Sequence, residues 1–106
     1  MQLEIDPKMG YKLIMAYEIK LTKKVLKNLR KSPQFVQEKF SFLIEELVKG
    51  PIQKDWPNYS KLDHNKHHCH LAYSWVACWK HEKNEIIIEV YYVGSREKAP
   101  YQEILV

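Results

Sequence analysis

Residues 15–51 read MAYEIKLTKKVLKNLRKSPQFVQEKFSFLIEELVKGP and predict one strand followed by two helices. In the first seven of these residues, Tyr17, Ile19 and Leu21 alternate with small or charged residues, which is the period-two pattern of a half-buried strand. Thr22 is a good N-cap, because its hydroxyl can accept an otherwise unpaired N–H group of a first helical turn. A strand that leads directly into a capped helix therefore opens the domain.

Two apolar stripes at helical spacing follow this cap, and Val25, Leu26 and Leu29 form the first of them. We expect Ser32 to cap a second helix and Pro33 to occupy its first turn. The buried face of that helix is predicted to comprise Val36, Phe40, Leu43, Ile44, Leu47 and Val48. Gly50-Pro51 is a typical helix end. The sequence thus predicts a helical hairpin.

The rest of the chain predicts a loop and then strands. Residues 51–66 are rich in Pro, Asn, Asp and Ser, which favours a loop. Three segments rich in aromatic and branched residues follow, His68–Leu71, Trp75–Lys80 and Glu85–Val93. Residues 72–74 form either a turn or part of one long strand. One strand before two helices and three after them predict an α+β domain, with the helices on one face of an antiparallel sheet and the other face open.

The N-terminal segment lies outside this pattern. We expect residues 1–14 to be an extension and residues 15–106 to be a single domain, since 106 residues are enough for one core. Tyr11–Ile14 either lengthens the first strand or forms a separate one.

The chain shows no export signal and no stretch of about 20 apolar residues that could span a bilayer. The sequence therefore predicts a cytoplasmic protein. The thiols of Cys69 and Cys78 are accordingly expected to be free.

The charge distribution favours a polyanionic partner. The net charge is +4 and the pI is about 9.0, which suits nucleic acid or an acidic protein. From residue 20 to residue 31 the basic residues are Lys20, Lys23, Lys24, Lys27, Arg30 and Lys31, with no acidic residue among them. On a helix they line the face opposite the apolar stripe, where they either contact a phosphate backbone or form an ordinary solvated surface.

The five histidines, His64, His67, His68, His70 and His81, fall within eighteen residues. Histidine titrates near neutral pH, so a positioned pair can take a proton from one oxygen and give one to another. Zinc binding is the alternative for a cluster that also contains Cys69 and Cys78. The spacing argues against it, because there is no Cys-x-x-Cys pair and neighbouring strand residues point to opposite faces. We therefore expect neither a metal nor another cofactor.

The C-terminal segment, Gly94-Ser95-Arg96-Glu97-Lys98-Ala99-Pro100-Tyr101, follows a predicted strand at a place where loops display functional groups. Arg96 offers a planar fork of donors suited to a phosphate. Tyr101 offers a ring that can stack on a base and a phenolic proton. The alternative is a surface ion pair of Arg96 and a tyrosine that anchors the tail.

In this order of elements, ending on Val-Gly-Ser-Arg and a later tyrosine, residues 15–101 resemble the RelE/ParE toxin superfamily. The segment from Cys69-His70-Leu71 through Trp75 to Trp79-Lys80 is especially similar to the YafQ branch. The resemblance implies the toxin of a type II toxin–antitoxin system. Such a toxin is a metal-independent mRNA endonuclease (an mRNA interferase) that acts on the ribosome, inhibits translation and is held inactive by an antitoxin.

The resemblance also implies roles for particular residues. His70 falls on a catalytic histidine of YafQ, Arg96 on the phosphate-binding arginine of RelE, and Tyr101 close to the C-terminal aromatic residue of both. The other RNA-binding candidates are the basic run and the residues that fall near an upstream YafQ histidine or the paired lysines of RelE: Lys61, His64, Lys66 and His67. The sequence departs from YafQ at Ser74, where that branch has an aspartate.

Two other functions share this scaffold. A ParE-like toxin inhibits DNA gyrase through protein contacts and cleaves no RNA, and the combination of His70, Arg96 and Tyr101 argues against it. A non-catalytic RNA-binding member of the fold is favoured by Ser74.

Overall fold

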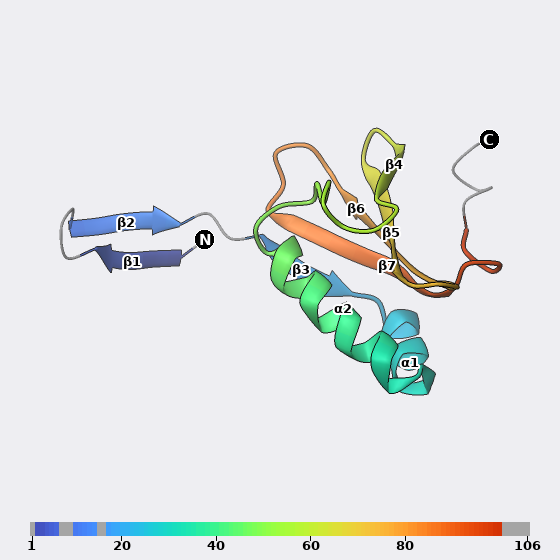
Figure 1. The fold of residues 1–106 in the computed structure, drawn as a ribbon. Coiled ribbons are helices and arrows are strands. Elements are labelled where there is room, and N and C mark those ends of the chain that lie inside the picture. Colours follow the sequence, from blue (N-terminus) through green and yellow to red (C-terminus); the bar gives the residue numbers. More distant parts are fainter. Residues whose placement is uncertain (1, 7–9, 15–16, 101–106) are drawn as a thin grey trace.

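The computed structural model describes residues 2–6, 10–14 and 17–100. Its main sheet has five strands in the order β3-β7-β6-β5-β4, and two helices lie together on one side of it (Figure 1). The predicted α+β class, with a strand, two helices and an antiparallel continuation, is confirmed. The elements are β3 (Glu18–Leu21), α1 (Lys23–Lys31), α2 (Gln34–Leu47), β4 (Ser60–Asp63), β5 (Lys66–Ala72), β6 (Trp75–His81) and β7 (Ile87–Ser95).

The sheet is mixed rather than antiparallel throughout, because β3 runs parallel to β7. Parallel neighbours need a long crossover connection, and here everything from α1 to β6 lies between the two strands. Strand β3 pairs with β7 as far as Leu21, opposite Val90. Beyond that point α1 covers the edge of β7, and the Asn28 side-chain amide donates a hydrogen bond to the Val93 carbonyl at 3.1 Å.

Helix α1 begins as expected, since the Thr22 hydroxyl accepts the N–H of Val25 at 3.1 Å. Its buried stripe is narrower than expected: Val25 is buried, but Leu26 is 40% exposed. Ser32 does not cap α2. Its backbone N–H closes the end of α1 on the Leu29 carbonyl, and Pro33 stands at the N-cap of α2 instead of in its first turn. The hydroxyl of Ser32 is already used, because it donates to the Asn28 carbonyl.

Helix α2 contributes Val36, Phe40, Leu43 and Leu47 to the core, all of them buried. Just after the helix, Gly50 adopts φ +156°, a conformation that side-chain-bearing residues rarely adopt. The Gln53 side chain then turns back and donates to the carbonyls of Glu46 and Gly50, which caps the helix end.

Strand β5 alternates strictly between the two faces of the sheet. Its buried residues Cys69 and Leu71 join the core under the helices, where Trp79 of β6 is fully buried. His68 and His70, which alternate with these two residues, are half-exposed on the open face. The alternation thus decides which histidines can meet a ligand.

The predicted loop of residues 51–66 contains one strand that the sequence pattern did not predict. Ser60–Asp63 forms β4, which pairs with β5 at the edge of the sheet. The tight turn at residues 64–65 joins them into a hairpin. Residues 73–74 form a turn between β5 and β6, so these are two strands rather than one long strand.

Strands β1 (Gln2–Asp6) and β2 (Gly10–Ile14) form a separate antiparallel two-stranded sheet. It lies to one side of the main sheet in Figure 1. Tyr11–Ile14 is therefore a separate strand rather than a longer β3.

Both cysteines are free, as expected, and both are buried. Cys69 faces the helices. Cys78 of β6 lies directly opposite His68 of β5 in the strand register and therefore belongs to the other face. Burial raises the pKa of both thiols, that of Cys78 to about 12. The sheet itself separates the two sulfur atoms.

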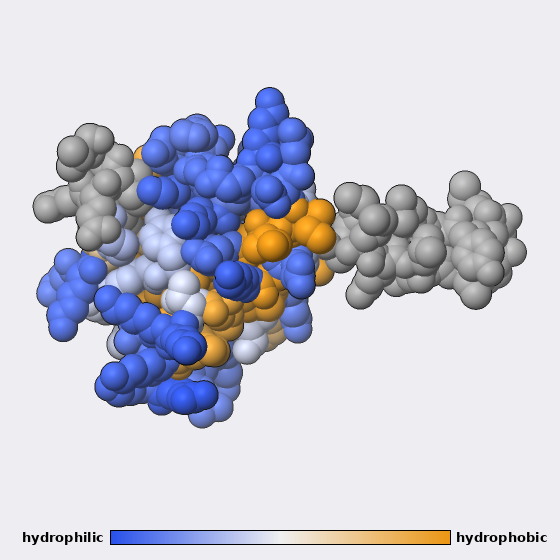
Figure 2. Space-filling model, turned by 180° about the vertical axis from the view of Figure 1, so that it is seen from behind, coloured by the Kyte–Doolittle hydropathy of each residue, from blue (hydrophilic) through white to orange (hydrophobic). Residues whose placement is uncertain are grey.

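The outer surface is mostly hydrophilic in the view of Figure 2, with a group of apolar side chains showing between the charged ones. The exposed large apolar residues in the described part of the chain are Leu26, Phe35, Phe42, Ile52, Tyr73, Ile86 and Ile87. Neither helix in that part of the chain has the length and apolar character of a membrane-spanning segment.

Candidate functional site

His70 lies on the open face of β5, close to the end of the strand. The loop before β4 holds its main chain on both sides: the Trp56 indole N–H donates to the His70 carbonyl at 2.9 Å, and the His70 N–H donates to the Pro57 carbonyl at 3.0 Å. These two bonds replace strand pairing at the point where β4 no longer covers β5. The backbone of His70 is therefore fixed, and its ring is directed away from the core.

Asn58 orients the ring of His70. Its side-chain nitrogen lies 3.3 Å from Nδ1 of His70 and can donate to it, which leaves the proton of the neutral ring on Nε2. Asn58 has a positive φ of 54°, a conformation that asparagine tolerates better than most residues. Partial burial and, to a smaller extent, the charge of Arg96 lower the pKa of His70.

Arg96 directly follows β7 and lies at the same end of the sheet as His70. Its backbone N–H donates to the Ser74 carbonyl at 2.8 Å, which ties the segment after β7 to the turn between β5 and β6. A hollow of about 350 Å³ opens between these segments, and its lining residues are Pro57, Asn58, His70, Leu71, Ala72, Tyr73 and Arg96. The structure thus brings together two of the three predicted catalytic residues. The third, Tyr101, lies outside the described residues.

His68 is a further candidate that the sequence analysis did not single out. It lies two residues before His70 on the same face, with the two ring centroids 5.9 Å apart. The Ser60 hydroxyl lies 2.9 Å from its Nδ1. Burial lowers the pKa of His68, and a hydrogen bond with the Ser60 backbone partly opposes that shift. Alternation along the strand is the sequence signal that pairs His68 with His70.

The segment before Arg96 depends on a glycine. Tyr92 lies on the open face and its hydroxyl donates to the Ser95 carbonyl at 2.6 Å. A Cβ atom at Gly94 would come within 2.8 Å of this hydroxyl oxygen. Gly94 therefore leaves the room that the Tyr92 ring needs beside the site.

His67 does not belong to the open face, which corrects its prediction as an RNA-binding residue. Its side chain is 3% exposed and packs against the rings of Tyr59 and Trp79, with centroid distances of 5.9 and 5.8 Å. The Tyr59 hydroxyl lies 2.7 Å from its Nδ1, within hydrogen-bond distance. His67 lies on the same face of β5 as Cys69 and Leu71. The alternation that exposes His68 therefore buries His67.

The buried His67 makes stability depend on pH. Burial is the main cause that lowers its pKa from 6.5 to about 4. Between these values the unfolded state binds a proton that the folded state does not, so the free energy of unfolding falls as the pH decreases from 6.5 to 4. We expect a loss of at most about 3 kcal/mol from this residue, measured as a shift of the urea midpoint.

His67→Gln removes this titration and keeps an acceptor for Tyr59. Its urea midpoint is expected to depend less on pH over the same interval than that of the parent. His68 and His70 add smaller contributions of the same sign to both proteins. Equal pH dependence in the parent and the variant would show that His67 is not the buried titrating group.

The other predicted RNA-binding residues divide into two groups. Lys20, Lys23, Lys24, Lys27, Arg30 and Lys31 are all exposed on β3 and α1. Lys61, His64 and Lys66 belong to the β4–β5 hairpin, at the opposite end of β5 from His70.

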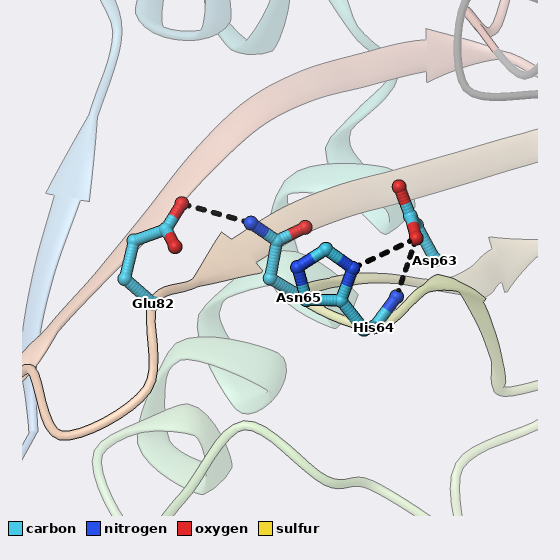
Figure 3. Close-up of polar contacts among 4 residues, drawn as sticks. All are labelled: Asp63, His64, Asn65 and Glu82. Atoms are coloured by element: carbon cyan, nitrogen blue, oxygen red, sulfur yellow. Dashed lines mark hydrogen bonds and ion pairs between the residues drawn. The ribbon is translucent and has the colours of Figure 1, made fainter.

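Two polar residues of that hairpin, His64 and Asn65, have acidic partners (Figure 3). Asp63 accepts hydrogen bonds from the backbone and the ring of His64, at 2.7 and 3.0 Å, and Asn65 donates to Glu82. The two bonds from His64 lower the pKa of Asp63. His64 therefore has a carboxylate partner of its own and stays apart from the hollow around His70.

Within the described residues, His, Cys, Asp and Glu side chains form no group of three that could hold a metal ion. The histidines are distributed over both faces of β5, and the His81 Nε2–H donates to the Glu85 carbonyl. What the site offers is a pair of imidazoles and a guanidinium, which can transfer protons and bind a phosphate.

Comparisons with solved structures identify the fold. The RelE chain of the archaeal RelE–RelB complex from Pyrococcus horikoshii OT3 is similar with a TM-score of 0.69 and 19% sequence identity, over 80% of this chain and 100% of that chain. A double mutant of E. coli RelE in the free state gives 0.65 and 20%, over 84% and 93% of the two chains. A metal-bound toxin from Helicobacter pylori gives 0.55 and 20%, over 79% and 98%.

The sequence itself matches no family model and none of the curated proteins. The solved structures named above are RelE proteins and a further toxin, so the YafQ branch finds no support in them. The fold is similar to these neighbours over 79–84% of the chain. The chain therefore has the fold of the RelE toxins.

Proposed function

We propose that this protein is a RelE-type toxin that cleaves RNA at the hollow between His70 and Arg96. The observation that carries the proposal is the meeting of the His68–His70 pair with Arg96 at one end of the open sheet face. Two imidazoles that can accept and donate protons, beside a guanidinium, are what phosphodiester cleavage without a metal needs. The similar solved structures include toxins, which supports the toxin part of the proposal, whereas the cleavage is argued from the site.

The reaction begins when a base removes the proton from an RNA 2′-hydroxyl. The freed oxygen attacks the adjacent phosphorus in line, the bond from phosphorus to the 5′-oxygen breaks, and that oxygen leaves with a proton. The products are a 2′,3′-cyclic phosphate and a 5′-hydroxyl. Arg96 neutralises the charge that grows on the phosphoryl oxygens.

His70 is assigned one of the two proton transfers. Its lowered pKa keeps the ring mostly neutral at pH 7, so it can accept a proton. There are two candidates for the second proton transfer. The geometry favours His68, and the family resemblance favours Tyr101. Alanine and phenylalanine variants of these two residues separate the possibilities.

The activity is tested with purified protein and single-stranded RNA. We expect cleavage in the presence of a chelator and a cyclic phosphate at the new end. A matched oligonucleotide with 2′-deoxyribose at the cut site is expected to bind with similar affinity and to stay intact, because it lacks the nucleophile. Cleavage of the deoxy substrate would exclude this mechanism, and binding without cleavage of either substrate would indicate a non-catalytic RNA-binding protein.

The biological context proposed here is that of a type II toxin–antitoxin system, with mRNA on the cytoplasmic ribosome as the substrate and an antitoxin as the inhibitor. The structurally similar archaeal RelE is found in a complex with RelB. The exposed basic residues of α1 suit an acidic, partly disordered protein segment that folds on binding. Co-purification with the product of a neighbouring short gene tests the partner.

A further inference from the structure

Tyr73 is the most exposed large hydrophobic residue in the described part of the chain, at 92%. It lies in the two-residue turn between β5 and β6, where Gly, Asn, Asp and Ser are the residues that turn geometry favours. An aromatic ring there contributes nothing to core packing. Neither the turn nor the core therefore explains the side chain.

The turn is held in place against the functional site. Across it, Ala72 pairs with Trp75, and the Ser74 carbonyl accepts the backbone N–H of Arg96 at 2.8 Å. Tyr73 lines the same hollow as His70 and Arg96. Its backbone is thus fixed relative to both groups, while its ring remains accessible to a ligand.

The chemistry of the hollow favours a nucleic acid over an acidic protein segment as the ligand of this ring. The hollow combines a cation, an imidazole and an aromatic ring, and the described residues that line it include no carboxylate. A nucleotide presents an anionic phosphate and a flat base within one unit. Proteins commonly hold unpaired bases by stacking them on aromatic rings.

We propose that Tyr73 stacks on a base of single-stranded RNA and so places the neighbouring phosphate between His70 and Arg96. The inference rests on the proposed cleavage and adds the residue that positions the substrate. Stacking is tolerant of base identity, because every base has a flat face. Tyr73 is therefore a positioning residue that acts on unpaired RNA. In a base-paired RNA helix the flat faces of the bases are covered by their neighbours, so the Tyr73 ring could not stack on them.

The test uses an oligonucleotide with 2′-deoxyribose at the cut site, so that binding is measured without cleavage. Tyr73→Ala is expected to weaken binding about 5- to 150-fold, and Tyr73→Phe is expected to bind like the parent because it keeps the ring. Phe42→Ala, which removes an exposed ring from α2, serves as the matched control and is expected to change nothing. Since Tyr73 is exposed, its variants should unfold at the parent's urea midpoint.

An abasic site in the oligonucleotide makes the test specific for stacking. Placed at the stacked position, it is expected to weaken binding to the parent and to have little further effect on Tyr73→Ala. Parent-like affinity of Tyr73→Ala for the intact oligonucleotide, in a protein that cleaves RNA, would overturn the inference and leave the proposed function standing. Failure of the parent to bind or cleave RNA would overturn both.

Discussion

His70→Ala is expected to lower the rate of RNA cleavage about 10²- to 10⁴-fold, the usual contribution of one proton-transfer group. Because the Trp56 and Pro57 bonds to this residue involve its main chain, the variant keeps them and the loop stays in place. RNA affinity and the urea midpoint should therefore remain close to those of the parent. Single-turnover cleavage of an end-labelled oligonucleotide measures the rate.

His64→Ala is the matched control, since it removes an exposed histidine whose partner is Asp63 at the far end of β5. At saturating protein concentration, where any contribution of His64 to RNA binding does not limit the rate, it is expected to cleave like the parent. His68→Ala and Tyr101→Phe are then compared with His70→Ala, and the one that shows a loss of the same order identifies the second proton-transfer group. Cleavage by His70→Ala at the parent's rate would remove His70 from the mechanism.

Trp79→Ala is expected to reduce the free energy of unfolding by about 3–5 kcal/mol, the usual cost of deleting a buried large aromatic side chain. Trp79 is fully buried, stacks on His67 and Tyr59, and donates its indole N–H to the Pro51 carbonyl at 2.9 Å. The variant loses the packing and also leaves a carbonyl without its donor. A loss of this size is a large part of the total stability of a small domain.

Urea unfolding followed by circular dichroism measures this loss. Trp79→Phe separates the two causes, because it keeps a ring in the stack and removes the bond to Pro51, and we expect about 1–3 kcal/mol for it. It also remains folded if the alanine variant does not. A parent-like midpoint for both variants would mean that the stack does not stabilise the loop and the sheet.

Much of the fold follows from local periodicity. The spacing of Val36, Phe40, Leu43 and Leu47 fixes α2, and the Thr22 cap fixes the start of α1, because both depend on near neighbours in the chain. Strand β4 is different. Ser60–Asp63 has one half-buried residue and no apolar alternation, so its structure comes from pairing with β5 rather than from its own composition.

The parallel pairing of β3 could not be predicted from its own pattern, since a half-buried strand alternates in either orientation. The prediction that Ser32 caps the second helix was wrong for a similar reason. Its hydroxyl is used by the preceding helix, and the sequence contains no sign of which helix it will serve.

Part of the site was present in the sequence. The alternation of Cys69 and Leu71 places His67 with the core and His68 with His70, so the strand pattern alone could have removed the first and added the second. The support from Trp56, Pro57 and Asn58 could not be foreseen, because it depends on how a loop rich in turn-forming residues packs against β5. Arg96 was proposed from its place in the C-terminal segment and from the family resemblance, and the bond from its backbone N–H to Ser74 shows what holds this segment beside His70.

The parallel pairing of β3 with β7 bears on the order in which the chain is made. Lys20 leaves a translating ribosome early, but its partner Glu89 and the carbonyl of Val93 that holds α1 are synthesised near the end. Arg96 follows later still. The sheet therefore closes only after the residues of β7 have emerged, and a nascent chain that ends before Arg96 lacks one half of the hollow. Under the proposed function, such an incomplete product of translation would lack a working site.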